Sequence, residues 1–495
     1  MSRIIIQNGN MCELDLPLKF AQKLYNEFAI RHPNAFYLRT RQRGMQNWDG
    51  KIHYITKTGQ FKIGLLPKVY DMCIEMGIKP KVVDMRQPLP KVSKVVTNIG
   101  KYKLRPEQEK AVKAVINNKI ENTPFHIGVL DYTVNAGKTL IMSSLYLSYK
   151  KQLKTLLITN DSDWLNQARE EFKQYLPGED ITFVQGKVLN WSNFTIGMVQ
   201  SISRNMRFYQ KELSQIDMVL IDEADQGGSK QYQNVITRLF NTRIRIGLSG
   251  TIYMSKLAKD RVKNMNLECF FGKVIAEFKL KDSIKKGYST KTVVKMVPGK
   301  PWYGNWESDC ISYKEIYDDS ITNCYTAWLM AYNRLLWNLN QGRYPALVVC
   351  KHIAHCENLY KFFKKKLGDA YNIAYVHVNT PSKLRQQIMK DFREGKIDIL
   401  VSTTIIARGK NFPKLRYLLN AASMDSQEKS IQFLGRLVRT DKSKKKVYLD
   451  DLHYPGNYLD RHGKHRKQYY QRQELKVILL DKLWKKHPNH SLIKS

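Results

Sequence analysis

Short, mostly apolar runs alternate with helical stretches through most of this chain, and this alternation constrains the fold more than any other feature. The runs lie at 127–131, 155–159, 194–198, 218–222 and 245–249, and again at 346–350, 374–378, 397–402, 417–421 and 446–449. Such runs between helices are typical of strands that are buried on both faces of a parallel sheet. The sequence therefore predicts an α/β fold with two doubly wound parallel-sheet domains in tandem.

The parts of the chain outside these two series predict a small domain before them and a tail after them. A helical pattern at 17–30 and strand-like runs at 36–41 and 52–56 predict a small α+β domain. A long helical pattern at 313–340 opens the second sheet domain. The predicted boundaries are 1–98 for a small basic N-terminal domain, 99–285 and 286–452 for the two sheet domains, and 453–495 for a basic, aromatic tail with no clear fold of its own.

The charge of the chain predicts its partner. Lys and Arg number 82 against 44 Asp and Glu, which gives a formal net charge of +38. Such an excess repels itself unless a polyanion accompanies it, so we expect nucleic acid, bound mainly through its phosphates. A basic proteome or a solubility effect is the alternative. No membrane span or secretory signal is evident, so we expect no membrane partner and a cytoplasmic location.

The first series of runs carries a turn that is suited to phosphate binding. Gly137-Lys138-Thr139 follows one predicted strand and opens an apolar helix, so backbone N–H groups there can hold phosphates. Lys138 can reach the terminal phosphates, and the Thr139 hydroxyl can hold Mg²⁺. Tyr132 stands where such a loop usually has its first glycine. That departure weakens the pattern, which needs support from other residues.

Asp222 and Glu223 supply this support at the end of a later strand. Hydrolysis of a nucleoside triphosphate needs a metal against the phosphates and a group that orients the attacking water. We assign Asp222 to the metal, through a water molecule, and Glu223 to the attacking water. The alternative is a solvated acidic strand end.

A third group lies in the second series of runs. Gln432, Arg436 and Arg439 recur at a spacing that puts them on one face of a helix. An arginine pair can stabilise charge on a transferring phosphoryl group. The alternative is a basic helix that faces solvent or DNA.

In their order along the chain, these motifs resemble those of the superfamily 2 helicases and translocases, over about residues 100–450. The matching segments are Arg105 with Gln108 (Q-like motif), Gly137–Thr139 (motif I), Asp222–Asp225 (motif II), Ser249–Thr251 (motif III), Ser402–Asn411 (motif V) and Gln432–Arg439 (motif VI). The resemblance implies two RecA-like domains, with ATP and Mg²⁺ as cofactors. It also implies that Arg105 and Gln108 contact the nucleotide, with Gln108 reading the adenine. Gly409 and Gln432 would lie at the nucleotide, and Arg436 and Arg439 would act as arginine fingers.

The N-terminal region resembles that of bacteriophage UvsW-like helicases, which remodel forks, recombination junctions and R-loops. The resemblance rests on the segments 39–43 and 47–51, and on the motif IV region at 346–356. It implies branched or duplex DNA as the partner, with RNA where it lies in an R-loop. The implied contacts are Arg39, Arg41, Arg43, Trp48 and Lys51. A solvated charged face is the alternative for these residues.

The expected function is therefore an ATP-dependent DNA helicase or translocase that remodels branched DNA in replication, recombination or repair. Asp222–Asp225 is spelled as in RNA helicases, but Gly250 and Gln432 depart from the motifs of those proteins. An ATP-dependent RNA helicase is the main alternative. A non-hydrolysing nucleic-acid-binding subunit and the motor of a nuclease are further ones.

Two other clusters have competing interpretations. Cys350, His352, His355 and Cys356 lie close together, but their spacing does not match paired zinc ligands. Aromatic residues among basic ones, at 302–306 and 454–470, can stack on bases or pack at a domain seam.

Overall fold

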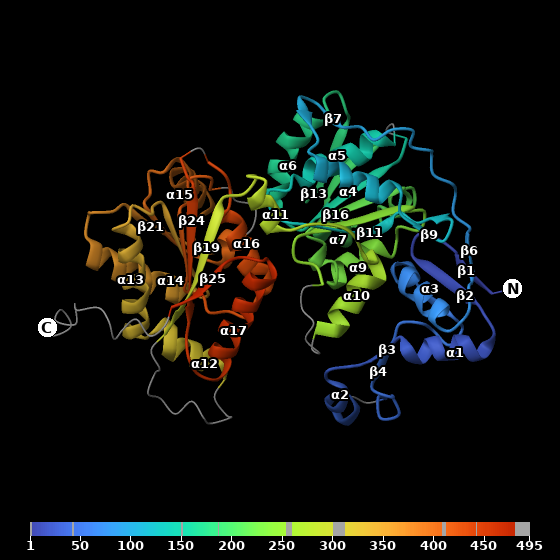
Figure 1. Cartoon of the computed structure of the whole chain (residues 1–495), viewed down its shortest axis with the longest axis horizontal. Helices are drawn as coiled ribbons and strands as arrows, with labels where there is room; N and C mark the ends of the chain where they lie inside the picture. Colours follow the sequence, from blue (N-terminus) through green and yellow to red (C-terminus); the bar gives the residue numbers. More distant parts are fainter. Residues whose placement is uncertain are drawn as a thin grey trace. The chain divides into compact units, whose positions relative to one another are not determined.

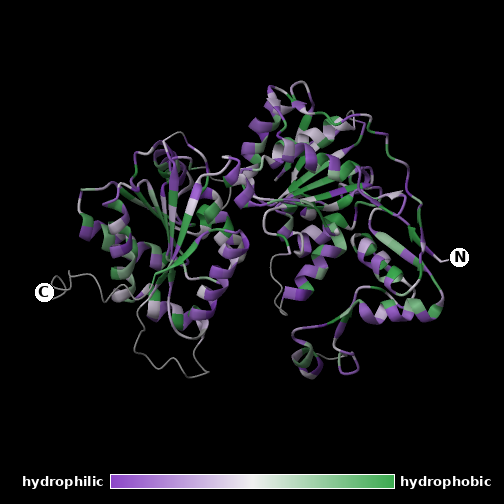
Figure 2. Cartoon of the chain, in the orientation of Figure 1, coloured by the Kyte–Doolittle hydropathy of each residue, from purple (hydrophilic) through white to green (hydrophobic). Residues whose placement is uncertain are grey.

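The computed structural model describes residues 2–41, 44–149, 152–186, 188–253, 260–299, 312–407, 412–441 and 443–480. The chain divides into two units, Met1–Phe278 and Lys279–Ser495 (Figure 1). Each unit is built on one large, mostly parallel sheet with helices packed against it, which confirms the predicted fold class. Hydrophobic residues gather in the strands of both sheets (Figure 2). Among the described residues, no helix is long and apolar enough to cross a lipid bilayer.

The sheet of the first unit has eight strands in the order β14-β13-β15-β12-β16-β17-β11-β18. All neighbours in it pair in parallel except the short β14. The strands are β11 (Ile127–Tyr132), β12 (Thr155–Thr159), β13 (Ile181–Gln185), β14 (Val188–Leu189), β15 (Phe194–Met198), β16 (Met218–Asp222), β17 (Ile244–Ser249) and β18 (Val274–Phe278). The helices are α4 (Pro106–Ile116), α5 (Lys138–Ser148), α6 (Ser162–Tyr175), α7 (Val199–Arg204), α8 (Gln210–Ser214), α9 (Lys230–Ile236) and α10 (Arg261–Phe271). The five runs predicted as strands in this part of the chain are all strands.

The N-terminal region is a small α+β structure that shares its hydrophobic core with the first large sheet. Its own sheet has the order β5-β2-β1-β6, and β3 pairs with β4 in a separate two-stranded antiparallel sheet. The elements are β1 (Arg3–Ile6), β2 (Met11–Asp15), α1 (Leu18–Glu27), β3 (Ala29–Arg31), α2 (Ala35–Arg41), β4 (Lys51–His53), β5 (Gln60–Lys62), α3 (Leu66–Glu75) and β6 (Lys81–Asp84).

The strand predicted at 36–41 is wrong, because this segment forms helix α2. Aromatic residues favour strands through packing on a pleated surface. Here Phe36 and Tyr37 are exposed and have no such surface, while Ala35 is buried. The Thr40 hydroxyl also donates to the Phe36 carbonyl over one helical turn, at 3.0 Å.

A buried arginine fastens the N-terminal region to the first large sheet. Arg245 lies in β17 and has no exposed surface. Its guanidinium donates to the Gly9 carbonyl at 2.6 Å and to Asn10 Oδ1 at 2.7 Å, both in the N-terminal region. It also donates to the Phe270 carbonyl at 3.2 Å. Gly9 must be glycine, because a Cβ there would lie 2.6 Å from the Leu239 carbonyl oxygen.

The second unit repeats the architecture with a seven-stranded parallel sheet in the order β21-β22-β20-β23-β24-β19-β25. Its strands are β19 (Lys291–Pro298), β20 (Ala346–Cys350), β21 (Ile373–Val376), β22 (Ile399–Thr403), β23 (Tyr417–Asn420), β24 (Lys446–His453) and β25 (Val477–Leu479). Its main helices are α11 (Leu280–Lys285), α12 (Tyr313–Tyr317), α13 (Tyr325–Leu339), α14 (Ile353–Leu367), α15 (Ser382–Glu394), α16 (Gln427–Leu437) and α17 (Asn457–Arg472). The helical pattern at 313–340 is thus two α-helices, separated by a π-helical turn at Asp318–Thr322.

The prediction that the tail has no fold of its own is wrong for residues 453–480. They form α17 and the edge strand β25, which pairs with β19. Arg466 of α17 is fully buried and donates to both carboxylate oxygens of Asp451, at 2.9 and 3.1 Å. Tyr454, Tyr469 and Tyr470 are buried as well, so they pack in the core and are not available for base stacking. The aromatic residues at 302–306 lie outside the described residues.

Candidate active site

The phosphate loop lies between β11 and α5, at the carboxyl edge of the first sheet. Asn135 and Gly137 both have left-handed backbone conformations, with φ of 65° and 74°. A side chain at Gly137 would be strained at this φ, and its Cβ would lie 2.2 Å from the buried Gln108 Nε2 atom, which would have to move. Helix α5 begins at Lys138, so its first N–H groups face this loop. Such groups, together with the helix dipole, form a site for anions.

The unusual Tyr132 has a structural explanation. It is the last residue of β11 and is fully buried. Its hydroxyl donates to the Glu107 carbonyl of α4 at 2.8 Å, and its backbone is outside the left-handed region that favours glycine. The turn begins one residue later, so the loop does not need a glycine at this position.

Asp222 and Lys138 lie close together at this edge of the sheet. The Lys138 Nζ atom is 3.8 Å from Asp222 Oδ1, and the Asp222 residue is only 4% exposed. Burial raises the pKa of the Asp222 carboxyl above its ordinary value, although the Lys138 ammonium acts in the opposite direction. No described residue donates a hydrogen bond to the buried Oδ1. Asp222, through a water molecule, and the Thr139 hydroxyl on the first turn of α5 would together suit a magnesium ion.

Glu223 follows Asp222 in a strained conformation. Its φ is 52°, a region that residues with a Cβ rarely adopt. Such strain persists only where the surroundings impose it, and it concentrates at functional sites. Asn135 shows the same feature in the phosphate loop, and asparagine is among the residues that tolerate it best. The sequence interpretation did not single out Asn135, although its residue type two positions before Gly137 was a usable signal.

Motifs II and III are connected by hydrogen bonds. The strand register places Asp131 of β11 opposite Ser249 of β17, with Asp222 of β16 one strand further along. The Ser249 hydroxyl donates to Asp225 Oδ1 at 3.1 Å and accepts from the Thr251 backbone N–H at 3.1 Å. Motifs I, II and III therefore meet at one edge of the sheet.

Gly250 of motif III packs against the phosphate loop. A Cβ at this position would lie 3.1 Å from both the Thr133 Cα atom and the Tyr132 carbonyl oxygen. Such a separation is shorter than ordinary van der Waals contact, so an alanine here would push on the loop. The glycine that distinguishes this motif from the RNA-helicase spelling is therefore part of the site's packing.

The Q-like motif lies against the same loop. Gln108 is fully buried, and its Nε2 donates to the Ala136 carbonyl at 2.8 Å. Its Oε1 accepts from the Arg105 N–H at 2.8 Å. The Arg105 guanidinium donates to the Asn135 carbonyl at 3.4 Å. These residues connect α4 to the phosphate loop, and the reading of adenine by Gln108 stays a prediction.

The motif VI residues lie in the second unit, in and just beyond α16. Gln432 and Arg436 are in the helix, but α16 ends at Leu437, so the prediction that Arg439 shares their helix face is wrong. Just beyond the helix, the Val438 carbonyl accepts from the N–H of Thr290, the residue before β19, at 2.8 Å. The Thr290 hydroxyl donates to the Arg439 carbonyl at 3.1 Å. The arginine-finger roles stay predictions, and Gly409 lies outside the described residues.

The predicted DNA contacts of the N-terminal region gather on α2 and on the segment before β4. Arg39 and Arg41 are exposed on α2, and Lys51 is exposed at the start of β4. Trp48 is half-buried and donates its indole N–H to the Lys51 carbonyl at 2.9 Å, so it shapes this segment. Arg43 lies outside the described residues.

The cluster of cysteines and histidines at 350–356 packs inside the second unit. His355 is buried beside Tyr317, with 3.2 Å between its Nδ1 atom and the Tyr317 hydroxyl. Burial lowers the pKa of His355 to about 3, so the ring is neutral. Cys356 Sγ lies 3.6 Å from the Val401 carbonyl oxygen. Within the described ranges, no group of three or more His, Cys, Asp or Glu side chains is placed to hold a metal ion.

Two family models match the chain in sequence order. The family described as "Type III restriction enzyme, res subunit" matches residues 101–254, and "Helicase conserved C-terminal domain" matches residues 329–441. The first range holds motifs I to III, and the second holds motifs V and VI.

Similar proteins include motors of several kinds. The chain is 21% identical to the ATP-dependent DNA helicase uvsW of Enterobacteria phage T4, over 88% of this chain and 90% of that protein. It is 23% identical to the helicase IRC3 of Saccharomyces cerevisiae, over 70% of this chain but only 51% of the yeast protein. A shorter stretch, 22% of this chain, is 32% identical to 24% of the ATP-dependent RNA helicase RhlB of Shewanella woodyi.

Solved structures support the fold. The restriction-modification enzyme LlaBIII bound to DNA matches 81% of this chain, and 34% of its own, with a TM-score of 0.57 and 15% identity. Yeast Dbp5 bound to RNA and ADP BeF3 matches 77% of this chain, and 91% of its own, with a TM-score of 0.52 and 15% identity. At such identities the likeness concerns the architecture of the two sheets.

Proposed function

This chain belongs to the superfamily 2 helicases, and from that premise we propose that it is an ATP-dependent DNA helicase or translocase that remodels branched DNA, such as forks, recombination junctions and R-loops. The observation that carries the proposal is the approach of Lys138 to Asp222 at 3.8 Å, beside a phosphate loop at a helix N-terminus. This arrangement supplies a cation and a carboxylate where the terminal phosphates of ATP would lie.

Each residue of this site has a proposed role in ATP hydrolysis. The N–H groups at the start of α5 bind phosphate oxygens, and Lys138 binds the terminal ones. Thr139 and Asp222 would hold Mg²⁺, which when bound neutralises charge on the phosphates. Glu223 orients the attacking water. Arg436 and Arg439 stabilise the charge that develops on the transferred group.

The hydrogen bonds around motif III support a coupling role for the loop. Gly250 lies against the phosphate loop, and Ser249 holds Asp225 of motif II. A change in the phosphate loop when ATP binds would therefore reach both motifs. We propose that this link transmits the nucleotide state to the surface that grips the DNA strand.

The choice of DNA rests on how much of each relative the chain covers. It spans 90% of the phage DNA helicase, whereas it matches 24% of the RNA helicase RhlB. The net charge of +38 supports contact with phosphates and predicts binding that weakens as salt rises.

The first test replaces the phosphate-loop lysine. We expect Lys138→Ala to reduce DNA-stimulated ATP hydrolysis by about 100-fold or more, because charge stabilisation at the phosphates is lost. Lys173→Ala is the matched control, since its side chain is 69% exposed on α6 and distant in the sequence from every motif. ATP hydrolysis that survives in Lys138→Ala would contradict the assigned site.

The second test concerns the substrate. ATP hydrolysis is measured with single-stranded DNA, blunt duplex, a fork, a four-way junction, an R-loop and single-stranded RNA. We expect the branched DNA substrates to stimulate most. Stronger stimulation by single-stranded RNA than by any DNA would favour the alternative of an ATP-dependent RNA helicase, which the structural likeness to Dbp5 keeps open.

A further inference from the structure

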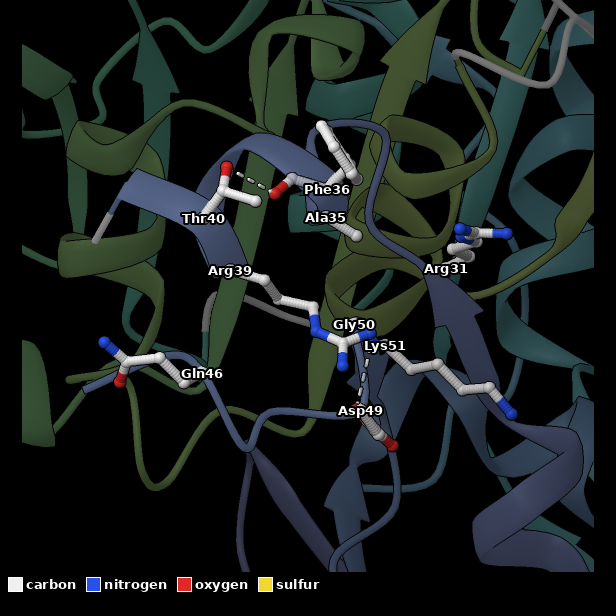
Figure 3. Close-up of a pocket in the computed structure, with 9 residues that line it drawn as sticks. All are labelled: Arg31, Ala35, Phe36, Arg39, Thr40, Gln46, Asp49, Gly50 and Lys51. Carbon is white, nitrogen blue, oxygen red and sulfur yellow. Dashed lines mark hydrogen bonds between the residues drawn. The ribbon is translucent and has the colours of Figure 1, made fainter. Parts of the chain in front are cut away.

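A cavity of about 510 Å³ lies between α2 and the segment that leads into β4 (Figure 3). This volume is suited to one nucleotide and is too small for a duplex. The residues that line it are Arg31, Ala35, Phe36, Arg39, Thr40, Gln46, Asp49, Gly50 and Lys51. In Figure 3 the Arg39 side chain extends from α2 toward Asp49 and Gly50, on the opposite side of the cavity.

The cavity has an excess of positive charge. Arg31, Arg39 and Lys51 are exposed, and none of the three forms an ion pair with a carboxylate of the described chain. Asp49 is the one carboxylate among the lining residues. It accepts from the Lys51 backbone N–H at 2.9 Å and lies 2.7 Å from His53 Nε2. The Asp49 carboxylate therefore already has hydrogen-bond partners, which leaves the side chains of Arg31, Arg39 and Lys51 available to an anion.

Exposed aromatic rings stand beside these cations. Phe36 lines the cavity with 79% of its surface exposed, and its neighbour Tyr37 is 55% exposed. The Arg41 guanidinium lies over the Tyr37 ring at 4.9 Å. Exposed aromatic rings next to unpaired cations are the combination with which proteins bind single-stranded nucleic acid, because bases stack on the rings and phosphates pair with the cations.

The walls of the cavity are held in place by hydrogen bonds and close packing. The His32 N–H donates to the Gly50 carbonyl at 2.8 Å, and Trp48 donates to the Lys51 carbonyl at 2.9 Å. Gly50 has a φ of 77°, and a Cβ there would lie 3.2 Å from that of Ala35. The cavity is therefore formed before a ligand arrives, which reduces the entropy that binding costs.

We propose that this cavity binds one unpaired nucleotide of a DNA strand, with its phosphate at Arg39 and its base stacked on Phe36. The inference rests on the proposed function and narrows it, because it assigns the N-terminal region to the single-stranded part of a branch. Inside a duplex both faces of each base are covered by neighbouring bases, so away from the two blunt ends Phe36 can stack only on an unpaired base. The phosphate contact carries no sequence information, so the site accepts any sequence.

The test measures the affinity of the full chain for two DNAs, a blunt duplex and the same duplex with unpaired arms, by fluorescence anisotropy without nucleotide. We expect Phe36→Ala and Arg39→Ala each to weaken binding of the armed duplex by about 10-fold and to change binding of the blunt duplex less than 2-fold. Phe36→Trp keeps a stacking surface and should retain the affinity. Both residues are exposed, so none of these changes disturbs the core.

Arg238→Ala and Phe240→Ala are the matched controls, because they remove one exposed arginine and one exposed phenylalanine near the amino end of β17, at the opposite edge of the sheet from the ATP site. Equal losses on both DNAs, or equal losses in the controls, would overturn the proposal. DNA-stimulated ATP hydrolysis is measured in parallel. If the wild type shows none, the motor assignment fails, while the affinity ratio of the two DNAs still decides the cavity.

Discussion

One fully buried arginine attaches the N-terminal region to the first parallel sheet, and another attaches the C-terminal segment to the second. The two guanidinium groups meet different partners. Arg245 meets only carbonyl oxygens, from Gly9, Asn10 and Phe270. Arg466 meets the carboxylate of Asp451 and, in addition, the carbonyls of Met424 and Leu452. An arginine thus holds each of these segments to a sheet. Arg245 does so through hydrogen bonds to carbonyl dipoles, and Arg466 does so mainly through a carboxylate of opposite charge.

The pKa values of the two arginine side chains differ accordingly. Burial lowers the pKa of Arg245 to about 9, since no carboxylate opposes it. Burial acts on Arg466 in the same direction, but Asp451 reverses the outcome and raises the pKa above its ordinary value. An ion pair in the core is costly to break because one charge is left behind, whereas carbonyl dipoles lose only hydrogen bonds. The comparison therefore predicts unequal effects of substitution.

The largest effect is expected from Arg466→Ala. It leaves the Asp451 carboxylate buried without its counter-charge, which should lower the free energy of unfolding of the second unit by about 3–5 kcal/mol. Denaturant titration of the full chain measures it. In the double variant Arg466→Met with Asp451→Asn the buried charge is gone as well, so much of the loss should be recovered. A loss in Arg466→Ala of less than about 1 kcal/mol would contradict the role of the pair.

A smaller effect is expected from acid, and it concerns the same attachment. His462 of α17 is 8% exposed, with its Nδ1 3.4 Å from the Ser423 carbonyl oxygen. Burial lowers the pKa of His462 to about 4. Between pH 6.5 and 4 the unfolded chain therefore binds a proton that the folded chain does not. Stability falls as the pH falls through this range, by up to about 3 kcal/mol from this residue.

Chemical denaturation of the wild type and of His462→Gln, at several pH values in that range, tests this expectation. The variant should show a shallower loss of stability toward pH 4. If both proteins lose stability in parallel, the proton does not bind at His462, and the attachment of the C-terminal segment is not sensitive to acid through this residue.

Replacement of the other arginine should matter less. Arg245→Met leaves the carbonyls of Gly9 and Phe270 without their donor but also removes a charge that is costly to bury. We expect a net loss of about 1–2 kcal/mol from the unfolding of the first unit. Between pH 6 and 8 the loss should be constant, because an arginine with a pKa of about 9 stays mostly protonated throughout. If Arg245→Met lowers the free energy of unfolding as much as Arg466→Ala does, the two attachments do not differ in the way that their partners predict.

The sequence predicted five strands in each sheet, because buried parallel strands leave unbroken apolar runs between helices. It missed the strands β13, β14, β18, β19 and β25. It also brought Lys138, Thr139 and Asp222 to one site, since strand ends at the same edge must lie together. It failed where the signal is not local. Helix α17 was missed because most of its residues are polar, and its buried face includes Arg466 and Tyr470.

The attachment of the N-terminal region was missed for a related reason. Arg245 visibly interrupts an apolar strand, but its partner Gly9 lies 236 residues earlier in the chain. Likewise, the Thr290 hydroxyl donates to the Arg439 carbonyl just beyond the end of α16, a contact across 149 residues. Helix periodicity carries no information about such contacts. The strand predicted at 36–41 is wrong because the aromatic rings of this segment, Phe36 and Tyr37, face solvent and do not pack on a sheet.

The smallest effect is expected from exposed ion pairs, which both attachments also contain. Lys68 pairs with Glu268 at the N-terminal region, and Lys281 pairs with Glu474 at the C-terminal segment. The lysine side chains are 53% and 59% exposed, so water and salt screen both pairs. We expect Lys68→Ala and Lys281→Ala to leave the denaturation midpoints of both units within experimental error. If either lysine variant lowers a denaturation midpoint nearly as much as the arginine variants do, the attachments depend on surface charge. The contrast between Arg245 and Arg466 would then not explain how the two segments are held.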